Sequence, residues 1–328
     1  MKKALLIVVL CATVCGLAFA GQPKKFTVGH IQATEQAFHQ ALLKFQEYVE
    51  KESNGSIQVE IFPNSQLGNA LTQISSVRMG TLTAFVDGVG WYGQLLGDYY
   101  LPATAYAIKN WEAYAEVMEG EIGNEMAEQL RKQFGLRVLN QDWMRLPRNV
   151  LAIRPINTVA DLQGLKLRVP ELKSYIVPWR DMGTSPTPIA FAEVYLALQQ
   201  RVAEGLECPI DTMYLQRLHE VAKFLIMTKH QMETGNFVMN DAFYNSLTAE
   251  EKKIVEDGAR LAAEYNNELC VENETVYLKR MLDEGVTVIE VDINEFYNKA
   301  KDSPAKLEEE GTWTKGLAAR VAAINDKH

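Results

Sequence analysis

Apolar and polar positions alternate in several short stretches of the chain, and each alternation predicts a β-strand. Residues 165–169 read LKLRV, so that apolar side chains flank Lys166 and Arg168 on both sides. This period of two is typical of a strand with one buried face. Pro170 ends the strand, because proline lacks the N–H that a central ladder needs. Arg168 is therefore expected at the carboxyl end of a strand, where open α/β sheets place their ligand clefts.

The segment after this strand is expected to hold Arg168 in a fixed setting. Residues 184–188 read TSPTP, which predicts a rigid extended connection. Residues 189–202 follow as a predicted helix, whose apolar face comprises Phe191, Val194, Tyr195, Leu198 and Val202. A guanidinium at a strand tip beside a proline-rich loop can present its planar fork to a carboxylate.

Strand and helix patterns also alternate before this region. Strands are predicted at 26–31, 56–62 and 82–87, with helices at 36–52 and 71–79 between them. This order indicates a parallel sheet with right-handed crossovers. A helix at 111–134 and a strand at 136–142 complete the first unit. The chain is then expected to cross at 142–147 to a second sheet, begun by strands 150–153 and 165–169, and to return through 228–236.

The last third of the chain is dominated by one helical pattern. Thr248 and Glu251 form a capping-box pair, and the pattern continues to about Asp283. Such a helix is about 52 Å long at 1.5 Å per residue, which is longer than one small domain needs. A late strand at 286–291 and a polar helical tail follow.

A glycine pattern occurs directly after the third predicted strand. Asp87 opens DGVGWYG, which contains the GxGxxG spacing of dinucleotide-binding turns. A continuous helix should follow such a turn, but Gly97 and Pro102 interrupt the sequence, and Trp91 would crowd a pyrophosphate. The preferred interpretation is a loop that presents Asp87 and Trp91 to a small ligand, with a plain structural turn as the alternative.

Composition and the N-terminus narrow the class of protein. The chain has 328 residues, 47% hydrophobic and 23% charged, which is typical of about two globular domains. Lys2 and Lys3 precede an apolar run that ends in AFA, so residues 1–20 are interpreted as a signal peptide cleaved after Ala20. Cleavage removes those two lysines and takes the formal charge from −9 to −11. This acidic balance argues against nucleic acids and anionic membranes as partners.

The residues that often carry chemistry show no catalytic or metal-binding spacing. Cys208 and Cys270 remain after cleavage without a reason to pair, and the five histidines are scattered. Neither a GxSxG nor an HExxH motif occurs. We therefore expect no cofactor, no metal and no enzymatic activity, and a secreted hydrolase is the least favoured alternative.

Longer motifs resemble a known family. GLKLRVP (164–170), SPTPIAFAEVYLALQ (185–199) and EGLECP (204–209) resemble the substrate-binding proteins of tripartite ATP-independent periplasmic (TRAP) transporters, of the dicarboxylate-binding-protein family. The resemblance implies an α/β periplasmic-binding-protein fold with two lobes. Each lobe has a mixed sheet flanked by helices, and the long helix spans both. It assigns residues 21–145 and 234–273 to lobe I, and residues 146–233 and 274–328 to lobe II.

The same resemblance implies several ligand contacts. Arg168 matches the arginine that pairs with the ligand carboxylate, and Arg148 falls near a second ligand-facing arginine, although Arg145 and Arg154 compete for that position. Phe191 matches an aromatic wall. Cys208 is a departure, because many relatives carry asparagine there, and a thiol is only a weak hydrogen-bond donor.

The remaining contacts are expected from lobe I and from the surroundings of Arg168. Candidates in addition to those named are His30, Gln32, Gln73, Asp87, Trp91, Glu171, Tyr175, Trp179, Asp211 and Asn236. Acids, amides and aromatic rings suit a hydroxylated carboxylate such as a sugar acid. Trp91, Tyr175 and Trp179 could equally enclose an aromatic or other monocarboxylic acid.

The resemblance also implies a mode of action. The protein would capture an organic acid in the periplasm by lobe closure and deliver it, as a monomer, to the small and large permease subunits in the membrane. A ligand-sensing partner of a receptor would use the same pocket, and the sequence does not separate these two roles.

Overall fold

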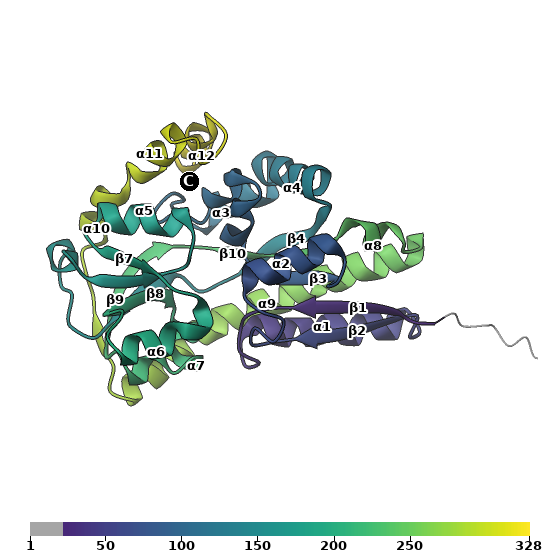
Figure 1. Ribbon diagram of the computed structural model, residues 1–328, viewed down its shortest axis with the longest axis horizontal. Coiled ribbons are helices and arrows are strands. Elements are labelled where there is room, and N and C mark those ends of the chain that lie inside the picture. The colour runs from purple at the N-terminus through teal and green to yellow at the C-terminus, as the bar shows by residue number, and fades with distance from the viewer. Residues whose placement is uncertain (1–21) are drawn as a thin grey trace, which may run out of the picture.

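The computed structural model describes residues 22–328, which form two lobes that each contain one mixed sheet flanked by helices (Figure 1). The predicted signal peptide, residues 1–20, lies outside the described residues.

The first lobe is built on a five-stranded sheet in the order β2-β1-β3-β10-β4. β1 pairs in parallel with β2 and β3, whereas β10 runs antiparallel to both of its neighbours. The strands are β1 (Lys24–Gly29), β2 (Ile57–Phe62), β3 (Ala84–Gly88), β4 (Leu136–Met144) and β10 (Thr234–Asn240). The helices are α1 (Ala37–Glu52), α2 (Ala70–Met79), α3 (Trp111–Glu119), α4 (Glu121–Phe134) and α8 (Asp241–Asn245).

The second lobe contains a six-stranded sheet in the order β11-β9-β5-β8-β6-β7. The strands are β5 (Arg148–Ala152), β6 (Lys166–Val169), β7 (Ser185–Pro188), β8 (Gly205–Pro209), β9 (Phe224–Gln231) and β11 (Thr287–Ile289). Its helices include α5 (Lys173–Asp181), α6 (Val194–Gln199) and α7 (Ile210–Leu215). β5 is antiparallel to β8 and β9, and β6 is parallel to β7 and β8, so this sheet is mixed as well.

Two short segments and one helix connect the lobes. The chain passes from β4 to β5 through residues 145–147 and returns from β9 to β10 through residues 232–233. The two segments are tied together, because the N–H of Arg145 donates to the carbonyl of Glu233 at 3.1 Å. The binding cavity described below lies beside this tie.

Helix α9 (Ala249–Asp283) is the third connection, and its 35 residues confirm the predicted long helix. The capping box is present, since the Thr248 side chain accepts from the N–H of Glu251 and the Glu251 carboxylate accepts from the N–H of Thr248. Val255 packs in the core of the first lobe and Met281 in the core of the second. The helix therefore spans both lobes.

The C-terminal helices contact both lobes. They are α10 (Ile293–Ala300), α11 (Ser303–Glu309) and α12 (Leu317–Asn325). Lys306 on α11 pairs with Asp181 of α5 at 2.8 Å. The Asn325 amide on α12 donates to the carbonyl of Ala107, in the loop before α3, at 2.9 Å.

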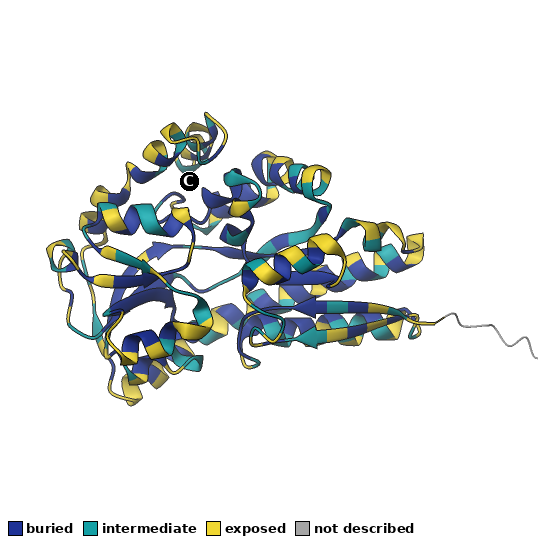
Figure 2. Ribbon diagram, in the orientation of Figure 1, coloured by how far each residue is buried: buried dark blue, intermediate teal, exposed yellow. Residues whose placement is uncertain are grey.

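Burial follows the layers of the fold. The central strands and the inner faces of the helices are buried, whereas the edge strands β2, β7 and β11 are only partly buried and the outer helix faces are exposed (Figure 2). No helix among residues 22–328 combines the length and the apolar character that crossing a bilayer requires.

Two helix predictions were wrong, and the predicted extended connection is in addition a strand. The helix predicted at 111–134 is two helices that meet at Gly120, where a Cβ would lie 2.1 Å from the carbonyl oxygen of Glu116. The connection at 184–188 pairs with β6 as edge strand β7, a position that tolerates proline. The helix predicted at 189–202 ends at Gln199, because Arg201 adopts a left-handed conformation with φ 57°. Val202 is consequently 51% exposed rather than part of an apolar face.

Candidate functional site

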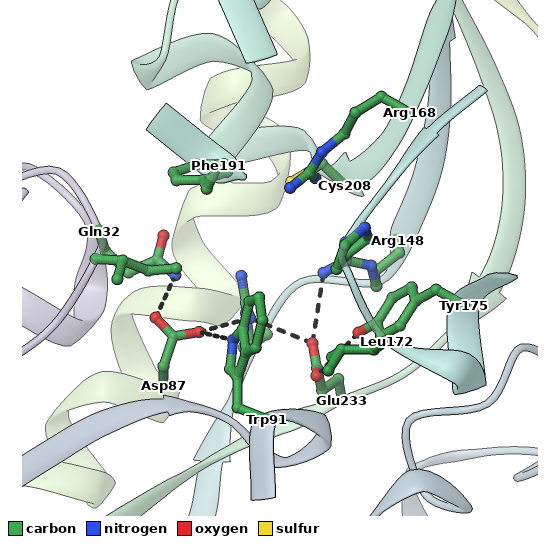
Figure 3. A pocket seen from close by; sticks show the side chains of 13 residues that line it. Gln32, Asp87, Trp91, Arg148, Arg168, Leu172, Tyr175, Phe191, Cys208 and Glu233 are labelled. Atoms are coloured by element: carbon green, nitrogen blue, oxygen red, sulfur yellow. Dashed lines mark hydrogen bonds and ion pairs between the residues drawn. The ribbon is translucent and has the colours of Figure 1, made fainter. Parts of the chain in front are cut away.

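One small cavity gathers side chains from both lobes and from both connecting segments (Figure 3). Its volume is about 30 Å³. Its lining comprises Ile31, Gln32, Asp87, Trp91, Arg145, Arg148, Arg168, Pro170, Leu172, Tyr175, Phe191, Cys208 and Glu233. Three arginines around one cavity indicate that it accommodates negative charge.

Arg168 reaches the cavity from the carboxyl end of β6 without an acidic partner. Arg168 is 2% exposed, and within residues 22–328 no carboxylate lies within 4.0 Å of its guanidinium. Its Nε donates to the carbonyl of Ile189 at 2.9 Å, and the group lies over the Phe191 ring at 5.9 Å. Burial lowers the pKa of Arg168, which is the sign of a cation that lacks full compensation. Its two terminal nitrogens thus remain available to an anion.

Arg148 is held by the protein's own acids. Its Nε and Nη2 donate to the two carboxylate oxygens of Glu207 at 2.5 and 2.8 Å, which is a bidentate pair. Burial alone would lower the pKa of Arg148, but the charge of Glu207 raises it well above its ordinary value. Burial also opposes ionisation of Glu207, yet Arg148 and His230 bring its pKa down to about 2. Most of the donor capacity of Arg148 is therefore already used.

Arg145 stands between two carboxylates on the side of the cavity away from Arg168. Its Nη1 lies 3.2 Å from Glu233 and 3.4 Å from Asp87. Asp87 also accepts from Gln32 Nε2 at 2.8 Å and from Trp91 Nε1 at 3.3 Å. Figure 3 shows Asp87 and Glu233 together at one side, and Arg168 with Cys208 at the other. The cavity is thus polarised, with free positive charge at one end and acceptor oxygens at the other.

The glycine pattern after β3 serves packing around this cavity. A Cβ at Gly88 would lie 2.5 Å from Glu233 Oε1 and 2.9 Å from Arg145 Nη1, so a larger residue there would shift the ends of these two side chains. A Cβ at Gly93 would lie 2.3 Å from the Tyr100 ring. The segment continues as a 3₁₀ helix, η1 (Val89–Gln94), which carries Trp91 to the cavity. Asp87 at the end region of β3 and Trp91 on η1 both line the cavity, while the glycines between and after them allow close packing.

Comparison with known proteins identifies the class. Residues 28–310 match the family described as bacterial extracellular solute-binding protein, family 7. A solute-binding protein of Roseobacter denitrificans is 31% identical over 304 residues, which cover 92% of this chain and 92% of that protein. The chain belongs to this family.

Solved structures of TRAP solute-binding proteins share its fold. The crystal structure of the Roseobacter denitrificans protein, with bound L-galactonate, has a TM-score of 0.84 at 30% identity and covers 92% of this chain and 99% of that one. A TRAP protein of Ochrobacterium anthropi with bound L-fuconate has a TM-score of 0.86 at 27% identity, covering 92% and 99%. The 2,3-diketo-L-gulonate-binding periplasmic protein of Escherichia coli is 30% identical over 273 residues, or 83% of this chain and 82% of that protein. The chain is thus a TRAP solute-binding protein with the two-lobed fold, and a transport component rather than an enzyme.

Eight of the residues predicted as ligand contacts line the cavity of this TRAP protein: Gln32, Asp87, Trp91, Arg148, Arg168, Tyr175, Phe191 and Cys208. Cys208 lies one residue before the end of β8 and close to Arg168 (Figure 3), and burial raises the pKa of its thiol to about 11, so it offers at most a weak donor.

Other predicted contacts lie away from the cavity. His30 is buried against His39, with Nε2 to Nδ1 at 3.0 Å. The Gln73 amide donates to the carbonyl of Gly68 at 2.8 Å. Asn236 is fully buried, and neither polar atom of its side chain has a partner among the described residues. Trp179 is buried against His230, with ring centres 4.8 Å apart, which removes one ring from the predicted aromatic enclosure.

Glu171 and Asp211 line two neighbouring cavities instead. The cavity at Glu171 has a volume of about 190 Å³ and shares Trp91 and Phe191 with the central one. The cavity at Asp211 is about 10 Å³ and shares Arg145. These residues therefore border the extensions of the central cavity rather than its centre.

Glu233 was not predicted as a site residue, and Arg145 was named only as an alternative to Arg148. Both lie in the connecting segments, where no periodic pattern marks a side chain as buried or as facing a cleft. Within residues 22–328, no group of three His, Cys, Asp or Glu side chains is arranged to hold a metal ion.

Proposed function

We propose that the protein binds a sugar acid, a polyhydroxylated carboxylate, with the carboxylate on Arg168. The observation that carries this proposal is the buried guanidinium of Arg168, which has a single backbone acceptor and no acid within 4.0 Å in the described chain. A ligand carboxylate would supply the missing counter-charge, and exclusion of water would strengthen that ion pair.

The opposite end of the cavity supports a hydroxylated ligand. Asp87 and Glu233 are acceptors for hydroxyl protons, while Gln32 and Tyr175 add polar groups. Two TRAP relatives at 27% and 30% identity have L-fuconate and L-galactonate bound. Both ligands combine one carboxylate with a chain of hydroxyls, which the groups of this lining could bind.

Ligand entry requires movement of the lobes. The central cavity of about 30 Å³ holds roughly two water molecules, which is far less than a six-carbon acid occupies. We assign the hinge to residues 145–147 and 232–233, with α9 as the third connection, and we divide the lobes at 145/146, 233/234 and 273/274. Separation of the lobes would open the cavity, and closure on the ligand would desolvate Arg168.

The wider role follows from membership of the TRAP family. The mature protein is proposed to begin at Gly21, to act in the periplasm as a monomer, and to deliver its ligand to the small and large permease subunits in the membrane.

A thermal-shift screen of the mature chain tests the ligand class. Aldonates should raise the melting temperature, because a ligand at 1,000 times its Kd stabilises the folded state by about 4 kcal/mol. The neutral alditols of the same sugars, which lack the carboxylate, should leave it unchanged. A melting temperature that responds to amines or alditols but to no carboxylate would overturn the proposal.

A further inference from the structure

The anionic side of the cavity has a feature that a general carboxylate site does not need. Glu233 places a second carboxylate beside Asp87, although both depend on the same guanidinium of Arg145. Glu233 is 2% exposed, and its Oε1 accepts from the Tyr175 hydroxyl at 3.1 Å. A buried acid in this position is costly to keep, which suggests that it has a role in choosing the ligand.

The charge of Glu233 is only partly compensated. Arg148 reaches Glu233 with one nitrogen at 3.4 Å, while Glu207 holds the same arginine through two contacts at 2.5 and 2.8 Å. Arg145 is shared with Asp87 and approaches neither acid closer than 3.2 Å. With Arg148 neutralised by Glu207, one cation faces two anions, so this end of the cavity carries excess negative charge.

The position of Glu233 is also fixed. Its backbone carbonyl accepts from the N–H of Arg145 at 3.1 Å, which ties it to the other connecting segment. The Tyr175 hydroxyl that donates to Glu233 accepts in turn from Gln231 Nε2 at 2.9 Å. Gly88 leaves the space that the carboxylate occupies, since a Cβ there would lie 2.5 Å from Glu233 Oε1. The carboxylate itself contacts Tyr175, Arg145 and Arg148, so it cannot easily turn away from an incoming group.

We infer that Glu233, with Asp87, makes the protein select hydroxylated monocarboxylates and reject sugar diacids. This inference rests on the proposed function, which puts one ligand carboxylate on Arg168. The far end of the ligand then meets carboxylate oxygens. A terminal hydroxyl donates a hydrogen bond to them, whereas a second carboxylate meets like charge in a desolvated site and is repelled.

Matched ligand pairs test the inference directly. An aldonate and the aldarate of the same sugar share carbon chain and stereochemistry, and differ only in a terminal CH₂OH or carboxylate. We would measure Kd by calorimetry for the galactose, glucose and mannose pairs with the mature wild-type chain, E233Q and the control E193Q. Glu193 is exposed and does not line the cavity, although it lies only two residues after Phe191, which does.

The expected result is a change in preference rather than a general loss. The wild-type chain and E193Q should bind the preferred aldonate at least about tenfold more tightly than its aldarate. E233Q should reduce that ratio about tenfold or more, because glutamine keeps the size and an acceptor oxygen but removes the charge. An unchanged ratio in E233Q, or equal weakening of both ligands, would overturn the inference.

Two further outcomes are also decisive. If E233Q does not fold, as judged by its melting curve, the wild-type ratio decides alone: equal binding of aldonates and aldarates overturns the inference. If the folded wild-type chain binds neither class, the proposed function itself fails, and the inference fails with it.

Discussion

Replacing Arg168 by methionine is expected to weaken ligand binding strongly, while the free energy of unfolding stays within about 1 kcal/mol of the wild-type value. Methionine fills a similar apolar volume but carries no charge. It removes the hydrogen bond from Nε to the carbonyl of Ile189, and this loss is destabilising. It also removes a buried cation without an acidic partner in the described chain, and this is stabilising. The two effects oppose each other in the ligand-free protein.

In ligand binding, no stabilising effect offsets the loss of the guanidinium. Truncating one partner of a buried charge pair costs about 2–5 kcal/mol, which corresponds to a Kd raised roughly 30- to 5,000-fold. Calorimetry with the aldonate that gives the largest thermal shift would measure the loss, and urea unfolding without ligand would measure stability.

Arg148→Met is the matched control. Arg148 is equally buried but paired bidentately with Glu207, so its removal leaves an uncompensated carboxylate. Breaking such a pair costs about 3–5 kcal/mol of stability. If Arg168→Met destabilised the ligand-free protein as much as Arg148→Met, Arg168 would belong to the structural framework. Near-native affinity in Arg168→Met would refute its assignment to the ligand carboxylate.

Two further predictions concern buried titratable groups. Burial lowers the pKa of His30 to about 3, so the unfolded chain takes up a proton near pH 6.5 that the folded chain refuses. The full contribution of this group to stability is present above pH 6.5, and about 2 kcal/mol of the free energy of unfolding should be lost between pH 7 and pH 5. In urea unfolding, the stability of His30→Gln should therefore depend less on pH than that of the wild-type chain. An equal pH dependence in the two proteins would contradict this. Burial also raises the pKa of Cys208, to about 11, and that of Cys270. Both thiols should therefore resist a disulfide reagent at pH 8 in the folded protein and react rapidly in denaturant; fast labelling of the native state would show that one of them is accessible.

The parts of the fold that follow a repeating pattern were predictable from the sequence. The alternation before Pro170 located β6 and placed Arg168 at its end, beside the cavity. The pair Thr248 and Glu251 located the start of α9 to the residue. In both cases, the local chemistry of the backbone decides the structure, so a short window of sequence is sufficient.

The remaining features depend on contacts between distant segments. Glu233 and Arg145 meet because two connections between the lobes lie side by side, and neither segment has a period that reveals this. Trp179 and Tyr175 are four residues apart on α5, yet only Tyr175 lines the cavity. Asn236 was an expected contact because of its polar side chain, and it pairs across β10 and β3 with Asp87, yet only Asp87 lines the cavity. Pairing across the fold decides each of these positions.

Helix α9 has a mechanical consequence for the motion of the two halves. A continuous rod anchored at Val255 in one core and at Met281 in the other cannot act as a free pivot. Between these anchors, residues 271–276 are exposed or only half-buried, so curvature there disturbs few packed neighbours. If the lobes separate to admit a ligand, as proposed above, this helix must bend together with residues 145–147 and 232–233.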